Sequence, residues 1–111
     1  MCGIAGIVGG WPDARATVER MLSSLRHRGP DGAAVHHVRG AVLGHQRLSI
    51  IDLEGGRQPI GNEDGTKWIV CNGEIYNYQE LIPELTRLGH VFRTRSDTEV
   101  IVHAGEAWGE S

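Results

Sequence analysis

The chain has 111 residues, 40% of them hydrophobic and 23% charged, and its formal net charge is −3. This composition is typical of one soluble globular domain or part of one, and the charge gives no electrostatic reason to expect binding to nucleic acid or to a membrane surface. No apolar run approaches the ~20 residues that a membrane-spanning helix needs. Because the only cysteines are Cys2 and Cys71, we expect no disulfide framework and a cytoplasmic location.

The first half of the sequence predicts a strand, a helix and a β-hairpin. Residues 2–8 are apolar and are followed by two glycines, as in a short buried strand. Residues 12–27 predict a helix, because their apolar side chains recur at helical spacing. Residues 33–38 and 41–47 predict two strands of a hairpin that turns at residues 39–40. The apolar face of the helix consists of Val18, Met21, Leu22 and Leu25.

The middle of the sequence contains fewer regular elements. Residues 48–61 are expected to be mostly irregular and residues 62–66 to form a polar turn, before a short apolar strand at residues 67–71. Apolar residues at helical spacing predict a helix at residues 78–88. Pro83 lies inside this helix and has no N–H, so we expect a kink there or a helix that begins later.

The end of the sequence predicts a short strand at residues 91–93 and a last helix. Ser96 and Glu99 fit a capping box at the start of that helix, with Ser96 as the N-cap. The helix is expected to bury its apolar face and to end at Gly109. The apolar face consists of Val100, Ile101, Ala104 and Trp108.

Strands paired by hairpins, with helices between them, predict an α+β layered fold. No linker and no internal repeat divides residues 1–111. Because the sequence stops directly after a helix, we expect the domain to continue. Residues 1–111 made alone would then leave sheet edges unpaired and apolar faces exposed, and we expect such a piece to be unstable or aggregated.

Cys2 is the first candidate for chemistry, because removal of Met1 would leave a thiol and a free α-amino group on one residue. The ordinary pKa values of a thiol and an α-amine differ by about one unit or less, so the amine can take the thiol proton directly or through a water. With Met1 attached, that nitrogen is an amide and cannot act as a base. For an isolated cysteine, the alternative of an inert buried side chain is the more common one.

Asn72, Gly73 and Glu74 directly follow the apolar strand. A thiol that attacks an amide places negative charge on the carbonyl oxygen, and that charge needs hydrogen-bond donors fixed in advance. The side-chain amide of Asn72 and the backbone N–H of Gly73 could supply two such donors. On the dipeptide alone, a tight hairpin turn is the more frequent meaning of Asn-Gly.

Arg47 and Asp97 suit the two charged ends of an amino-acid substrate. The guanidinium of Arg47 could pair with an α-carboxylate, while Asp97 could pair with an α-ammonium. Each residue also has an ordinary alternative, such as a helix N-terminal charge for Asp97.

We expect no metal site and no nucleotide-binding loop in this chain. The glycines near the N-terminus do not match a dinucleotide or phosphate-binding motif, and the sequence has no Cys-x-x-Cys and no His-Glu-x-x-His. His36 and His37 are adjacent, so on a strand they would point to opposite faces. His27 and His45 are expected to be polar packing residues, and Cys71 a buried thiol.

Six motifs that occur in order resemble the N-terminal glutaminase domain of glutamine-hydrolysing asparagine synthetases, which are N-terminal-nucleophile amidotransferases. The resemblance covers essentially all of the chain. The longer central motifs are more similar to asparagine synthetases than to the aminosugar-synthase, purine-pathway or glutamate-synthase members. The motifs are Met-Cys-Gly-Ile-Ala-Gly-Ile (1–7), Arg-His-Arg-Gly-Pro-Asp-Gly (26–32), Gly-His-Gln-Arg-Leu-Ser-Ile-Ile-Asp-Leu (44–53), Gln-Pro-Ile (58–60), Asn-Gly-Glu-Ile-Tyr-Asn (72–77) and Ser-Asp-Thr-Glu-Val-Ile (96–101).

The resemblance implies roles for the reacting groups. Cys2 would attack the glutamine carboxamide, form a glutamyl thioester and release ammonia. Asn72 and Gly73 would form the oxyanion hole. Arg28, in the loop at residues 26–32, would lie over the nucleophile.

The resemblance also implies how glutamine is held. Arg47 would bind the substrate carboxylate, and Glu74 and Asp97 would bind its ammonium group. Four consecutive residues would line the pocket through their backbone, and these are Leu48, Ser49, Ile50 and Ile51.

For the whole protein, the resemblance implies an αββα four-layer sandwich that is incomplete at its C-terminal end in residues 1–111. A synthetase domain that uses ATP and Mg would follow, while no cofactor is expected in this part. The partners would be glutamine, the synthetase domain and a second copy in a homodimer, and the ammonia would convert aspartate to asparagine. Two alternatives remain: an amidotransferase of this kind that acts on another carboxylate, and a non-catalytic piece of the same fold.

Overall fold

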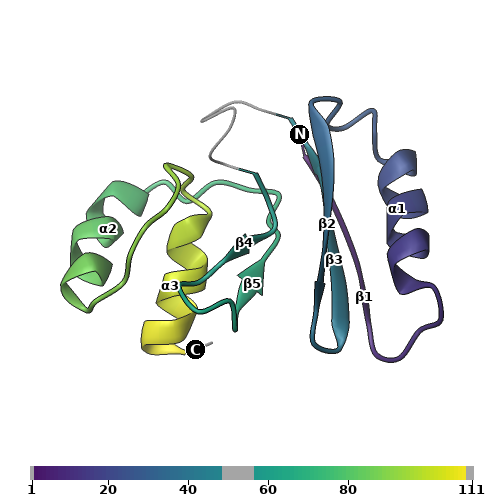
Figure 1. Ribbon diagram of the computed structural model, residues 1–111. Coiled ribbons are helices and arrows are strands. Elements are labelled where there is room, and N and C mark those ends of the chain that lie inside the picture. Colours follow the sequence, from purple (N-terminus) through teal and green to yellow (C-terminus); the bar gives the residue numbers. More distant parts are fainter. Residues whose placement is uncertain (1, 49–56, 110–111) are drawn as a thin grey trace.

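The computed structural model describes residues 2–48 and 57–109. Within these residues the chain forms three helices and two antiparallel sheets, so the predicted α+β class is confirmed. Across the molecule the elements succeed one another as α1, a three-stranded sheet, a two-stranded sheet, α3 and α2 (Figure 1). No helix in the described part of the chain has both the length and the apolar character to cross a lipid bilayer.

The three-stranded sheet has β3 at its centre. It contains β1 (Gly3–Val8), β2 (Gly32–Val38) and β3 (Ala41–Arg47), in the order β1-β3-β2. The predicted hairpin is confirmed, because Val38 pairs with Ala41 across a two-residue loop in which Gly40 has a φ of 81°. Gly3 pairs with Gln46, and Gly32 pairs with Arg47. The pairing therefore brings together, at one end of the sheet, the start of β1, the start of β2 and the end of β3.

Helix α1 (Ala14–Ser24) covers one face of this sheet. Val18 and Leu22 are buried against Val42 and form the core of this half. The helix has no room for a side chain at Gly44 of β3, where a Cβ atom would lie 2.6 Å from Val18 Cγ1. The helix is shorter than predicted, and Met21 is 39% exposed although its spacing placed it on the apolar face.

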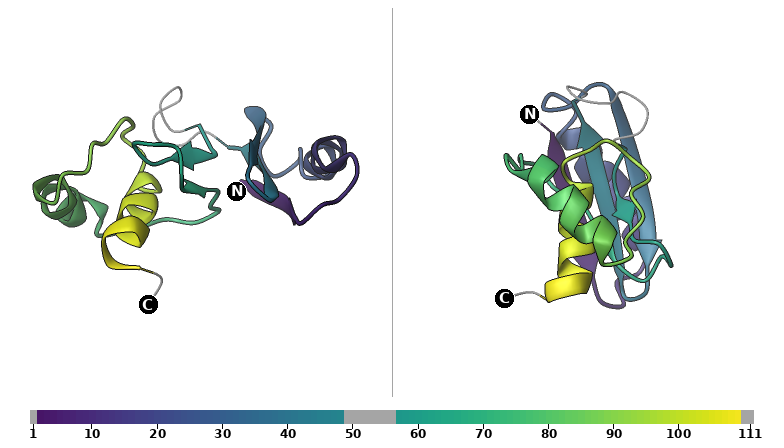
Figure 2. Two further views of the ribbon diagram at one scale, coloured as in Figure 1. Left: turned by 60° about the horizontal axis from the view of Figure 1, so that its bottom comes forward. Right: turned by 90° about the vertical axis from the view of Figure 1, so that its left-hand side faces the viewer.

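The second half of the described chain contains four short elements. They are β4 (Ile60–Gly61), β5 (Trp68–Ile69), α2 (Tyr78–Arg87) and α3 (Glu99–Trp108). Helix α3 contacts both of these strands and α2. Figure 2, in its right-hand view, shows α2 and α3 in front of the three-stranded sheet. The buried apolar side chains here are Ile60, Leu85, Val100 and Val102.

An aromatic stack joins the two halves. The ring centroids of His36 on β2 and Trp68 on β5 lie 3.7 Å apart with the rings stacked. The face of the larger sheet opposite α1 therefore packs toward β5, which gives the layer order that Figure 1 shows.

Several predicted elements of the second half differ in the structure. The strand predicted at residues 67–71 is reduced to the two residues of β5, and no strand forms at residues 91–93. In that segment the backbone N–H of Arg93 donates to the Glu99 carboxylate, so it does not pair with another strand. Helix α2 begins at Tyr78 and runs through Pro83, so the expectation of a later start is wrong.

The start and face of α3 also differ from the prediction. The N-cap is Thr98, and the Ser96 hydroxyl accepts the Thr98 N–H at 3.2 Å, outside the helix. The Glu99 carboxylate does not reach back to Ser96, so the predicted capping box is wrong. Trp108, predicted to be buried, is 45% exposed. The predicted end at Gly109 is confirmed, with a φ of 80°.

The contact at Gly44 predicts a loss of stability on enlargement. Gly44→Ala places a methyl group against Val18 and Leu22, so the free energy of unfolding should fall by about 1–3 kcal/mol. Gly10→Ala is the matched control, because no atom lies within 4 Å of its Cβ position. Thermal unfolding of the intact protein measures both variants. Equal midpoints for the two variants would contradict the packing of α1 on β3.

Candidate functional site

The thiol of Cys2 lies beside the end of β3. Leu48 N–H donates to Cys2 Sγ at 3.3 Å, and Sγ lies 3.5 Å from the Leu48 carbonyl oxygen. Arg28 Nε donates to the Cys2 carbonyl oxygen at 3.1 Å. The predicted neighbourhood of Arg28 and Cys2 is therefore present, and Cys2 is held at two points, at its sulfur by Leu48 and at its carbonyl by Arg28.

The loop before β2 is fixed against the backbone of Arg47. Asp31 N–H donates to the Arg47 carbonyl at 2.9 Å, and Gln46 Nε2 donates to the Gly29 carbonyl at 2.5 Å. A Cβ atom on Gly29 would lie 2.4 Å from the Arg47 carbonyl carbon. Only glycine permits this approach, which holds Arg28 beside Cys2.

A pocket of about 360 Å³ opens at this end of the three-stranded sheet, beside Cys2. A second hollow, of about 450 Å³, lies between α1 and β2, but none of the residues predicted to react or to bind substrate lines it. We therefore take the pocket at Cys2 as the candidate site. It brings together seven of the predicted site residues, which are Cys2, Arg47, Leu48, Asn72, Gly73, Glu74 and Asp97.

The segment after β5 supplies the second wall of the pocket. This segment contains three exposed residues, Asn72, Gly73 and Glu74. In the described part of the chain they do not connect two paired strands, so the alternative that Asn-Gly forms a hairpin turn is not supported. Ile75 N–H donates to Asp97 Oδ2 at 2.7 Å. This bond connects the segment to the start of α3 and fixes the Asp97 carboxylate at the pocket.

Arg47 is the buried cation of the pocket. Its side chain belongs to the last residue of β3 and is 7% exposed. Arg47, Glu74 and Asp97 give the pocket one positive and two negative groups, which is the pattern predicted for an amino-acid zwitterion. The predicted backbone contacts at Ser49, Ile50 and Ile51 lie outside the described residues.

Other residues line the pocket without having been assigned to it from the sequence. Gln58 is buried, and its Oε1 accepts the Cys71 N–H at 2.6 Å, so it connects the segment before β4 to the segment before Asn72. The sequence placed Gln58 in a motif but gave it no role. The full set of these residues is His45, Gln58, Cys71, Tyr76, Ser96 and Thr98.

The second thiol, Cys71, lies in the same pocket. Burial raises the pKa of the Cys71 thiol, and the charges of Asp97 and Cys2 raise this pKa further. A raised pKa lowers the thiolate fraction near neutral pH. Cys71 is therefore a poor nucleophile. The residue is only half-buried and lines the pocket, so the prediction of a buried thiol is not fully met.

His45 is buried on β3 and is 2% exposed. Burial lowers the pKa of His45, a hydrogen bond with the backbone of Cys71 opposes this change, and the charge of Arg47 lowers the pKa further. The imidazole therefore stays neutral near pH 7. This agrees with the predicted packing role and places a neutral ring beside the cationic Arg47.

The lowered pKa of His45 predicts a pH dependence of stability. An unfolded histidine titrates near 6.5, so between that value and the lower folded pKa the unfolded chain binds more protons. Stability should therefore fall as the pH is lowered through 6.5. In thermal unfolding, His45→Gln should reduce the slope of stability against pH between about pH 7.5 and about pH 5.5. The exposed control His37→Gln should keep it, and an unchanged slope in His45→Gln would contradict the assignment.

Comparison with known proteins agrees with this geometry. A family model described as a glutamine amidotransferase domain matches residues 1–111. The chain is 48% identical to a protein of Sandersonia aurantiaca named asparagine synthetase [glutamine-hydrolyzing], and the match covers 100% of this chain and 21% of that protein. It is 45% identical to a protein of Bacillus subtilis named asparagine synthetase [glutamine-hydrolyzing] 1, and that match covers 92% of this chain and 17% of the relative. The chain thus spans about a fifth of the length of the curated relatives it matches. The chain belongs to the glutamine amidotransferase domain family.

Proposed function

We propose that this chain is the glutaminase part of a glutamine-hydrolysing asparagine synthetase, with Cys2 as its nucleophile. The observation that carries the proposal is the pocket that Cys2 shares with Arg47, Asp97 and the segment Asn72–Glu74. A thiol, an oxyanion donor pair and groups for both charges of an amino acid are the parts that amide hydrolysis of glutamine needs. The names of the relatives support the same activity.

The proposed reaction begins after Met1 is removed. The α-amine of Cys2 takes the thiol proton, and the sulfur attacks the carboxamide carbon of glutamine. The developing oxyanion accepts hydrogen bonds from the Asn72 side chain and the Gly73 N–H. Collapse breaks the C–N bond, and the nitrogen leaves as ammonia with the proton from the amine. Water then hydrolyses the thioester to glutamate and restores the thiol.

Substrate selection follows from the charges of the pocket. The Arg47 guanidinium pairs with the α-carboxylate, while Glu74 and Asp97 pair with the α-ammonium. The hydrogen bond from Ile75 to Asp97 supports this role, because it fixes the carboxylate in advance. The backbone of Leu48, Ser49, Ile50 and Ile51 completes the proposed pocket.

The proposal extends to the whole protein. A synthetase domain with ATP and Mg would use the ammonia to convert aspartate to asparagine, in a cytoplasmic homodimer. The described layers, α1, two sheets and α3 with α2, would form part of an αββα four-layer sandwich. Since this chain spans only about a fifth of the length of its relatives and none of the pocket roles proposed above concerns the acceptor, another carboxylate acceptor is a second candidate.

Removal of the nucleophile should separate the two nitrogen sources. In the intact protein, Cys2→Ala should abolish glutamine-dependent activity and retain activity with added ammonia, because only the first requires the thiol. Cys71→Ala is the matched control and should retain both activities. Equal loss of both activities in Cys2→Ala would show that the role of Cys2 is misplaced.

Removal of one oxyanion donor should act on the rate. Asn72→Ala should lower kcat for glutamine hydrolysis about 10²–10³-fold with little change in KM, because the oxyanion exists only in the transition state. Steady-state kinetics of glutamate release measures this change. Gln79→Ala, on the exposed side of α2, serves as the control. A change confined to KM would assign Asn72 to ground-state binding instead.

A further inference from the structure

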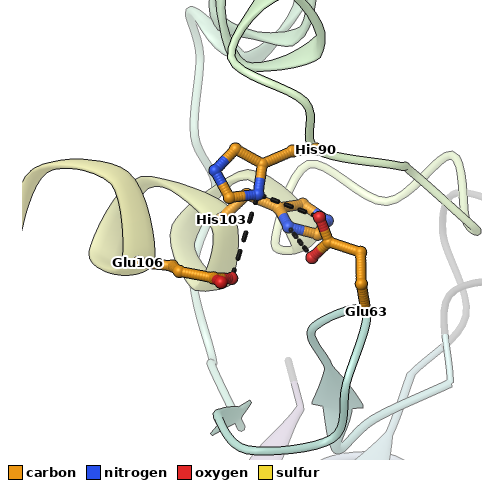
Figure 3. A group of neighbouring side chains, drawn as sticks. All are labelled: Glu63, His90, His103 and Glu106. Carbon is orange, nitrogen blue, oxygen red and sulfur yellow. Dashed lines mark hydrogen bonds and ion pairs between the residues drawn. The ribbon is translucent and has the colours of Figure 1, made fainter.

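Four potential metal ligands gather between α3 and the segments that follow β4 and α2. Glu63 follows β4, His90 follows α2, and His103 and Glu106 lie one turn apart on α3 (Figure 3). One ligand atom from each of the four lies within 4.8 Å of the others. None of the four lines the pocket at Cys2. This group is called the Glu63 cluster below.

Two buried atoms of the Glu63 cluster form no hydrogen bond among the described residues. His103 Nδ1 and Glu63 Oε1 lie 3.0 Å apart, which is ion-pair distance, but their contact is not a hydrogen bond and neither atom has another hydrogen-bond partner there. The side chain of His103 is 1% exposed. A buried polar atom without a partner is costly and calls for an explanation such as a bound ion.

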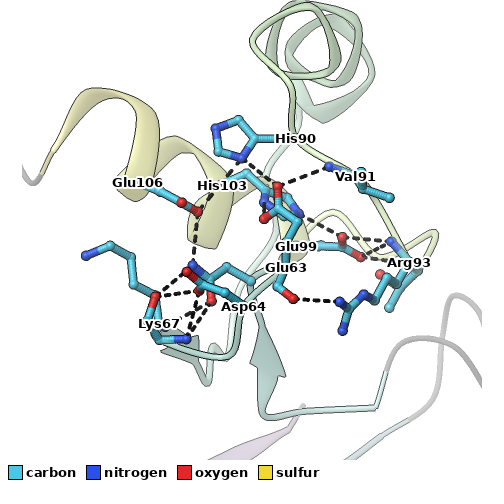
Figure 4. Close-up of polar contacts among 12 residues, drawn as sticks. Glu63, Asp64, Lys67, His90, Val91, Arg93, Glu99, His103 and Glu106 are labelled. Carbon is cyan, nitrogen blue, oxygen red and sulfur yellow. Dashed lines mark hydrogen bonds and ion pairs between the residues drawn. The ribbon is translucent and has the colours of Figure 1, made fainter.

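The Glu99 carboxylate fixes the orientation of the His103 ring. Both oxygens of Glu99 accept backbone N–H groups, from Arg93 and Thr94, and Figure 4 shows Glu99 near Arg93 and His103. His103 Nε2 lies 2.9 Å from Glu99 Oε2, and the other ring nitrogen, Nδ1, is turned toward Glu63. Metal-binding histidines are commonly oriented in this way by a carboxylate on the other nitrogen.

The distances in the Glu63 cluster are near those of a small tetrahedral site. Ligand atoms about 2.0–2.1 Å from a zinc ion are roughly 3.4 Å apart. Two of the separations are 3.0 Å, for His103 Nδ1 to Glu63 Oε1, and 3.8 Å, for His90 Nδ1 to Glu106 Oε2, and the four ligand atoms all lie within 4.8 Å, so a bound ion would draw the side chains closer together. His90 Nδ1 also forms a 3.0 Å hydrogen bond with Glu63 Oε2, which a bound ion would replace.

The surroundings hold the ligands and leave one side open. Asn62 Nδ2 donates to Glu106 Oε2 at 3.0 Å, and Val91 N–H donates to Glu63 Oε2 at 3.2 Å. The exposed fractions of the side chains are 10% for His90 and 36% for Glu106. An ion could therefore enter past Glu106 and reach the buried imidazoles.

We propose that the Glu63 cluster is a structural site for a zinc-like divalent cation, held by His90, His103, Glu63 and Glu106. Two imidazoles and two carboxylates favour a borderline ion such as Zn²⁺ over Mg²⁺ or Ca²⁺, which prefer oxygen ligands alone. The ion would neutralise the two carboxylates and tie the loop after β4, the segment after α2 and α3 together. Binding would stabilise the folded state by mass action.

The test uses Zn²⁺ and the intact protein after treatment with a chelator. Equilibrium dialysis against buffered zinc, followed by metal analysis, should give about one zinc per chain, and the midpoint of thermal unfolding should rise with zinc. Glu106→Gln, at the exposed ligand, and His90→Gln should each weaken binding about tenfold or more. Co²⁺ in place of zinc should give the visible absorption of a four-coordinate site in the parent protein only.

Matched controls separate the Glu63 cluster from other ligands. His37→Gln and Glu84→Gln change an exposed histidine and an exposed glutamate elsewhere, and both should bind zinc like the parent. A Cys2→Ala, Cys71→Ala double variant should retain the zinc. Zinc binding that is absent, that is unchanged in both Glu106→Gln and His90→Gln, or that is lost with the cysteines would overturn the proposal. None of these outcomes depends on glutaminase activity.

Discussion

The antiparallel pairing of β1 with β3 sets the position of Cys2, the proposed nucleophile, at the candidate site. Through this pairing Gly3 lies opposite Gln46, so the next residue back, Cys2, reaches Leu48, which is 46 positions away in sequence. The loop containing Gly29 packs on the same end of β3 and brings Arg28 to the Cys2 backbone. The core of Val18, Leu22 and Val42 holds this sheet. The proposed nucleophile is therefore fixed by tertiary packing of the first half of the chain.

The second half of the chain is organised by two carboxylates, two positions apart, at the start of α3. Asp97 turns toward the pocket, where Ile75 N–H fixes it, and Glu99 is buried on the other side, where it binds the backbone of residues 93–94 and orients His103. Glu99, which orients His103 of the Glu63 cluster, therefore lies two residues from Asp97 of the candidate pocket, although the two sites have no residue in common.

The sequence predicted best where the signal is local. The hairpin at residues 39–40 and the Val18–Leu22 face of α1 follow from a glycine turn and helical spacing, and both are present. The predicted strand at residues 91–93 and the Ser96 cap failed because side chains distant from strand pairing or from the cap accept these backbone donors: Glu63 binds Val91 N–H, Glu99 binds Arg93 N–H, and the Thr94 hydroxyl binds Ser96 N–H. Family motifs located seven pocket residues, but no motif spacing links Glu63, His90 and His103, because folding alone brings these separate segments together.

The proposed catalysis depends on a free α-amine and a reactive sulfur at Cys2. The most direct measurement is intact-mass and peptide analysis of the active protein after reaction with a diazo-ketone analogue of glutamine. We expect an N-terminal peptide that begins at Cys2, lacks Met1 and carries the whole label on its sulfur. Active protein that retains Met1, or a label found mainly on Cys71, would contradict the assignment of Cys2 as the nucleophile.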